Sequence, residues 1–167
     1  FAAFYALAPT AYNAISITEL SGTQTFYFPI TLIQSYTDVQ VAIVNSTDLM
    51  PGFTGYQAVK YTNYGLLPAS GTISYAIDNP NVTIISVSPS TIVSSASSFT
   101  HNYTNLLPGQ TQYVNVSLLT ATLPTISLGT DVTFSVINTS DVADVNTGND
   151  TFSLVKTVVG CYDPNDK

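Results

Sequence analysis

The sequence predicts an all-β protein, an immunoglobulin-like antiparallel β-sandwich with an extra N-terminal β segment. Three observations favour this fold. Short runs of alternating apolar and polar residues, rich in β-branched and aromatic side chains, recur along the chain. Clusters of Gly, Pro, Asn and Asp separate these runs at intervals of roughly 10 to 15 residues, as in sandwich folds. No window combines an apolar stripe at helical spacing with capping residues, so we expect essentially no long helix.

Four alternating runs open the predicted sandwich, and a turn cluster follows each of them. These runs are residues 39–43, 57–63, 72–77 and 81–87. Ile73, Tyr75 and Ile77 illustrate the pattern, because small or polar residues stand between them. Side chains two residues apart lie on the same face of a strand, so these three are expected to face the core.

Four further runs complete the predicted sandwich. They are residues 98–103, 111–119, 131–137 and 152–159. In residues 111–119, Val114, Val116 and Leu118 share one face, and polar or aromatic residues occupy the other. Eight strands in all favour two packed sheets, which we assign to residues 36–160.

The first 35 residues form a separate predicted segment that is rich in aromatic side chains. Residues 14–20 and 25–33 are predicted strands, joined by a turn at residues 21–23. Two strands alone are only marginally stable in water. This segment must therefore pack on the sandwich, finish a preceding domain, or pair with another chain.

The composition favours an extracellular β protein and argues against several partners. Apolar residues make up 45% of the 167 residues, whereas charged residues make up 8%, compared with roughly 25% in an average domain. The net charge is −7, and the only basic residues are Lys60, Lys156 and Lys167. Three lysines are too few to neutralise the phosphates of a nucleic-acid backbone. We therefore expect no nucleic-acid partner. No apolar run approaches the roughly 20 residues of a membrane helix, so we expect no membrane insertion.

The end of the chain predicts a junction between modules at residues 161–167. The last predicted strand is followed by Cys161, Tyr162 and the turn-forming residues Asp163-Pro164-Asn165-Asp166 before Lys167. Proline fixes φ, and Asn and Asp stabilise turns through their own side chains. Cys161 is the only cysteine, so it cannot form an internal disulfide and is either free or able to cross-link to another module.

Three stretches together carry a resemblance to a known family. They are Pro51-Gly52-Phe53 with Val59 to Gly65, Tyr103 to Gln110, and Thr157 to Lys167. In this order and spacing they resemble the immunoglobulin-like repeat modules of large cell-surface proteins that gliding and related bacteria export by the type IX secretion system. Cys161 departs from the family pattern, in which a small residue such as Ser more commonly precedes the aromatic residue. The resemblance implies secretion and display at the cell surface, without a defined ligand.

Catalysis finds little support in the sequence, so we expect no enzyme. His101 is the only histidine and Glu19 the only glutamate. A Cys–His pair requires hydrogen-bond contact, but His101 and Cys161 belong to the ends of different predicted strands. No cofactor is expected, apart from a possible calcium ion.

The calcium candidate is the acidic stretch between the last two predicted strands. Its proposed ligands are Asp141, Asp144, Asn146 and Asp150. Calcium takes six to eight oxygen ligands, which carboxylates, amides and carbonyl groups of such a loop could provide. The spacing departs from the EF-hand loop, because Gly148 stands where that loop has a ligand and no glutamate ends it. The alternative is a polar connection that uses Asp and Asn for turn geometry.

Surface glycans are a second candidate partner, because exposed tyrosine rings can stack on sugars. The candidates are Tyr56, Tyr61, Tyr64 and Tyr103. The chain could also carry glycans itself: six Asn-x-Ser/Thr triplets occur, and Asp150-Thr151-Phe152 loosely fits an O-glycosylation pattern. The sequence does not define which of these positions are used.

Three functional hypotheses follow from these observations. The preferred one is a non-enzymatic structural or adhesive module of a secreted bacterial cell-surface protein, in contact with neighbouring modules. The second is a subunit of a self-assembling extracellular filament, in which the N-terminal segment donates a strand to another copy. The third is a calcium- or glycan-binding module.

Overall fold

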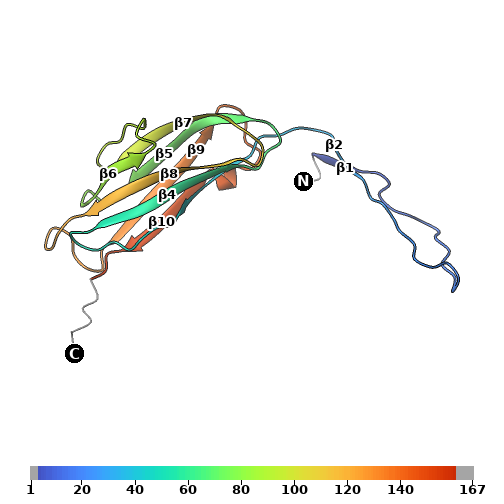
Figure 1. Ribbon diagram of the computed structural model, residues 1–167, viewed down its shortest axis with the longest axis horizontal. Coiled ribbons are helices and arrows are strands. Elements are labelled where there is room, and N and C mark those ends of the chain that lie inside the picture. Colours follow the sequence, from blue (N-terminus) through green and yellow to red (C-terminus); the bar gives the residue numbers. More distant parts are fainter. Residues whose placement is uncertain (1–3, 161–167) are drawn as a thin grey trace. The chain divides into compact units, whose positions relative to one another are not determined.

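The computed structural model describes residues 4–160 and divides the chain into two compact units, Phe1–Tyr36 and Thr37–Lys167. The first unit holds a two-stranded sheet and the second holds two four-stranded sheets (Figure 1). The predicted junction at residues 161–167, including Cys161, lies outside the described residues.

The second unit is an antiparallel β-sandwich, which confirms the predicted fold class. Sheet I has the strand order β10-β9-β5-β7. Its strands are β5 (Ala69–Ile77), β7 (Ser98–Leu106), β9 (Asp131–Ser140) and β10 (Thr151–Thr157). Sheet II has the strand order β3-β4-β8-β6. Its strands are β3 (Val39–Val44), β4 (Thr54–Asn63), β6 (Val82–Ser88) and β8 (Thr111–Thr120).

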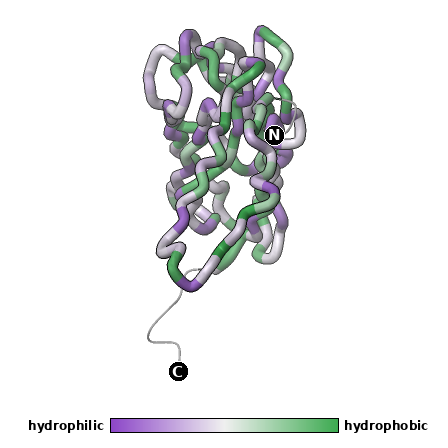
Figure 2. The backbone as a smooth tube through the Cα atoms, turned by 90° about the vertical axis from the view of Figure 1, so that its right-hand side faces the viewer, coloured by the Kyte–Doolittle hydropathy of each residue, from purple (hydrophilic) through white to green (hydrophobic). Residues whose placement is uncertain are grey.

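Alternation builds the core between the two sheets. In β3 every second residue is buried, and the same pattern recurs in β5 and β9. Hydrophobic and hydrophilic residues accordingly alternate along the chain (Figure 2). Tyr75 stacks on Phe99 with a centroid distance of 5.0 Å and also contacts Phe134. Each such side chain stabilises the fold by about 1.5–3 kcal/mol through removal of its apolar surface from water.

The first unit pairs β1 (Tyr5–Leu7) with β2 (Ile30–Leu32). The predicted strand at residues 14–20 is wrong, because this segment has no strand partner and its side chains are exposed. A turn ends the extended run: the Ser21 N–H donates to the Thr18 carbonyl at 3.0 Å, and the Ser21 hydroxyl oxygen accepts from the Thr18 N–H at 2.8 Å. Short side-chain acceptors compete in this way with strand pairing.

Helical structure among residues 4–160 is confined to one short 3₁₀ turn, η1 (Thr147–Asn149). Within this described range, no helix has the length and apolar character needed to cross a membrane.

Candidate functional site

The predicted calcium loop covers the edge of β3. The two carboxylate oxygens of Asp144 accept separate backbone hydrogen bonds, one from Val39 N and one from Asn146 N, each at 2.8 Å. Asp150 Oδ1 accepts from Asn138 Nδ2, also at 2.8 Å. Asp141 lies at the end of β9, where its N–H donates to the Ser70 carbonyl at 2.9 Å. The structure therefore gives Asp144 and Asp150 structural hydrogen-bonding roles.

Neighbouring carboxylates influence the pKa of Asp150 in this loop. Burial raises the pKa of the Asp150 carboxyl, and the nearby Asp144 and Asp38 carboxylates raise it further, while the hydrogen bond from Asn138 lowers it. Within residues 4–160, no group of three His, Cys, Asp or Glu side chains is placed to hold a metal ion. Calcium binding at Asp141, Asp144, Asn146 and Asp150 stays a prediction.

His101 takes part in a polar chain inside the sandwich. The Tyr61 hydroxyl donates to Gln112 Oε1 at 2.7 Å and lies 3.0 Å from His101 Nε2. With its proton directed to Gln112, the Tyr61 oxygen is an acceptor for an Nε2–H group of His101. Burial lowers the pKa of the His101 imidazole, and it raises the pKa of Tyr61 to about 12. These hydrogen bonds join β4, β7 and β8.

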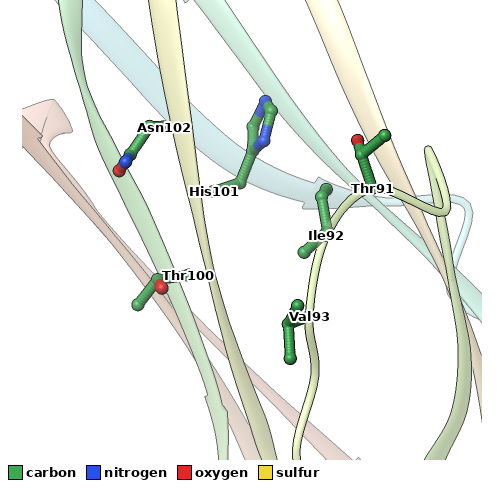
Figure 3. Close-up of a pocket in the computed structure, with 6 residues that line it drawn as sticks. All are labelled: Thr91, Ile92, Val93, Thr100, His101 and Asn102. Atoms are coloured by element: carbon green, nitrogen blue, oxygen red, sulfur yellow. The ribbon is translucent and has the colours of Figure 1, made fainter.

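A pocket of about 390 Å³ lies beside His101 (Figure 3). It is bounded by residues 91–93 of the β6–β7 connection and by residues 100–102 of β7. Figure 3 shows His101 and Ile92 on one side of β7, with Thr100 and Asn102 on the other. The pocket thus lies along the edge of a strand.

The predicted sugar-stacking tyrosines divide into two groups. Tyr61 and Tyr103 are 1% and 3% exposed, so the stacking prediction is wrong for them. Their rings contact each other in the core at a centroid distance of 5.5 Å. Tyr56 and Tyr64 are 57% and 52% exposed and remain candidates for stacking.

One side of the sandwich is closed where β3 and β10 meet. Parallel bridges join Thr37 to Asp144 and Leu49 to Val158. The Val159 N–H donates to the Leu49 carbonyl at 2.9 Å. Backbone groups at both ends of this pair are thus hydrogen-bonded, which protects an edge from pairing with other chains.

The opposite side is only partly closed, by the connection between β6 and β7. The Ala96 carbonyl accepts from Ile84 N at 2.7 Å, which covers β6, and the Ser98 carbonyl accepts from Ser95 N at 2.8 Å, which covers the start of β7. Pro89, which has no N–H, follows β6 directly.

The isolated bridge between Ser94 and Phe99 extends this cover, so the edge of β7 is open only beyond Thr100. In an antiparallel pair, alternate residues direct both backbone groups to the same neighbour. Since the Ser98 carbonyl faces the connection, Asn102 also directs its N–H and C=O groups away from β5, and a register shift opposite Ser70 interrupts the alternation after Tyr103. No other backbone group within residues 4–160 pairs with these groups. Sequence reasoning missed this edge, because alternation shows which face a side chain occupies but not which strand has no neighbour.

Comparison with known proteins identifies the fold. No family model matches the chain, and no curated protein matches its sequence. Among solved structures, it is similar to a crystal structure of the CARDB domain of the PF1109 protein from Pyrococcus furiosus, in complex with di-metal ions. The TM-score is 0.52 at 16% identity, over 75% of this chain and 96% of that chain.

Two further solved structures are similar to the chain with lower scores. The solution structure of the same CARDB domain has a TM-score of 0.47 at 17% identity, over 75% of this chain and 98% of that chain. The CaDoc0917–CaCohA2 complex has a TM-score of 0.45 at 15% identity, over 72% of this chain and 99% of that chain. At these identities a likeness concerns the fold alone. The sheet topology and the likeness to the CARDB crystal structure together show an immunoglobulin-like β-sandwich.

Proposed function

We propose that this chain is a non-enzymatic structural or adhesive module of a secreted bacterial cell-surface protein. The observation that carries this proposal is the outer face of sheet I, where short uncharged polar side chains dominate. Those on β5, β7 and β9 include Thr72, Ser74, Thr100, Asn102, Ser135 and Thr139. Such a face lacks the titratable pairs that general acid–base catalysis uses, and suits contacts with neighbouring modules.

We further propose that the parent protein is exported by type IX secretion and displayed at the cell surface. The resemblance of residues 51–65, 103–110 and 157–167 to such modules supports this step. An 8% charged composition fits the same setting, because the surface is covered by Ser, Thr, Asn and Tyr. Contact with surface glycans through Tyr56 and Tyr64 is part of the adhesive alternative.

Antibody labelling of intact cells tests the proposal. An antibody raised against residues 37–160 is expected to label the surface of the encoding bacterium, and labelling should vanish when type IX secretion is disabled. Labelling only after the cells are permeabilised would overturn surface display. Surface labelling that persists without type IX secretion would overturn the export route alone.

A second candidate function is self-assembly through the N-terminal unit. The exposure of its apolar side chains favours this candidate: Phe28, Ile30 and Leu32 are 47%, 71% and 43% exposed. A row of this kind marks an interaction surface. Sedimentation velocity over a range of concentrations tests it, and a protein that stays monomeric throughout would contradict assembly.

A further inference from the structure

We infer that the open edge of β7 is the acceptor for this assembly and that its occupant is β2 of a second copy of the chain. The β1–β2 hairpin of one molecule then extends sheet I of the next. This inference rests on the second function proposed above, and it names the two surfaces that would meet.

The acceptor requires an extended chain as its partner. Asn102 offers an unpaired N–H and C=O group on the outer edge of β7. Added strands bind through such main-chain groups, and pockets beside them receive alternate side chains. The pocket of about 390 Å³ between residues 91–93 and 100–102 lies along this edge and has no charged residue in its lining.

The free edge of β2, which would act as the donor, keeps all of its backbone N–H groups. The Pro29 carbonyl accepts from Ala8 N at 3.4 Å, and Ile33 N donates to the Phe4 carbonyl at 2.8 Å. Odd-numbered residues of this strand therefore face β1, and Phe28, Ile30 and Leu32 direct their backbone groups to the free edge. Proline lacks an N–H, and Pro29 lies on the β1 side, so the free edge keeps all its donors.

Other edges of the sandwich are less suitable acceptors. The β3–β10 side is bridged at both ends, the edge of β6 is covered at Ile84, and Pro89 follows β6. Lys156 on β10 adds a charged side chain, of the kind that natural sheets use to discourage edge pairing.

The two proposed partners carry no such charges. Residues 98–106 of β7 and 25–33 of the donor contain no Asp, Glu, Lys or Arg. Each molecule has one donor and one acceptor, so the contact would propagate head to tail.

Three proline variants test the pairing. Asn102→Pro removes an N–H that faces the open edge, and Ile30→Pro does the same on the donor. Proline is tolerated on edge strands where the N–H faces solvent, so both variants should fold. Ser153→Pro is the matched control: Asn138 N donates to the Asp150 carbonyl, so the N–H of Ser153 faces away from β9.

Sedimentation velocity of the full chain measures the concentration at which each variant assembles. The unmodified protein and Ser153→Pro should assemble as concentration rises, whereas Asn102→Pro and Ile30→Pro should each need about tenfold or more higher concentration. An equimolar mixture of these two variants should form dimers and stop there. The Asn102→Pro chain keeps a working donor, and the Ile30→Pro chain keeps a working acceptor.

Several results would overturn the inference, and they separate its failure from failure of assembly itself. If Asn102→Pro, folded by circular dichroism, assembles like the unmodified chain, β7 is not the acceptor although assembly stands. If Ile30→Pro still assembles while Asn102→Pro does not, β7 pairs with β7 of another copy. If the unmodified protein is a monomer at every concentration, both self-assembly and the pairing of β2 with β7 are wrong.

Hydrogen exchange of the unmodified protein provides a measurement that does not depend on variants. The Asn102 amide should exchange markedly more slowly as assembly proceeds, while the Ser153 amide should not change. Unchanged exchange at Asn102 in an assembled sample would overturn the inference.

Discussion

The Tyr103 hydroxyl lies over Gly71 and donates a hydrogen bond to Asn138 Oδ1 at 2.9 Å. Gly71 pairs with Tyr103 on one side and with Ser140 on the other, so this bond joins β7 to β9 across β5. A Cβ atom at Gly71 would lie 2.7 Å from Tyr103 Oη and would also collide with the Thr139 carbonyl oxygen. The missing side chain of Gly71 thus makes room for the bond.

We expect Gly71→Ala to destabilise the sandwich by about 1–3 kcal/mol, the usual cost of inserting atoms into a packed core. Urea unfolding measures the change. Gly148→Ala is the control, because its Cβ would meet only Asn146 Oδ1 at an ordinary 3.5 Å. Equal stability of Gly71→Ala and the unmodified protein would show that the strands shift freely at this point.

Removal of the Tyr61 hydroxyl should cost about 1–3 kcal/mol, because it leaves the polar atoms of His101 and Gln112 without their partner. The matched control is Tyr64→Phe, whose hydroxyl belongs to a half-exposed side chain. Chemical denaturation of both variants gives the comparison. Similar losses from Tyr61→Phe and Tyr64→Phe would contradict a special role for the buried chain.

Asp150→Asn should raise the melting temperature at pH 7. Burial is the main reason why the pKa of Asp150 lies above its usual value of 3.8, with neighbouring carboxylates adding to it. The folded state therefore binds the proton more tightly than the unfolded state, and the carboxylate lowers stability above the folded pKa. As pH falls through that pKa to below 3.8, this cost disappears, and the two proteins should converge. A lower melting temperature for Asp150→Asn at pH 7 would refute this account.

The two interpretations of the acidic loop differ in the effect of calcium: if the Asp144 carboxylate serves only the backbone hydrogen bonds that it accepts, calcium and chelators leave the melting temperature unchanged. Asp144→Ala should instead cost about 1–3 kcal/mol in either condition, since the Val39 and Asn146 N–H groups lose their acceptors. Calorimetry with and without calcium tests both statements. Stabilisation by calcium that Asp144→Ala abolishes would establish the metal site.

The strands were predictable because their signal is local. Ile73, Tyr75 and Ile77 alternate within one strand, and burial follows directly. The neighbours of a strand depend on contacts far apart in sequence, so the open edge of β7 was not predictable. The acidic loop shows the same limit: Asp144 lies 105 residues from its partner Val39. Composition there favoured a polar turn and kept calcium as the alternative, but it did not show which backbone groups the carboxylates would meet.

The parallel bridges that flank β3 and β10 have a mechanical consequence. The chain enters the sandwich at the Thr37–Asp144 bridge and leaves it just after the Leu49–Val158 bridge, at the other end of the same pair. A pull on the flanking chain would act along these two strands in opposite directions. The contacts between them would be loaded together in shear instead of peeling apart one by one.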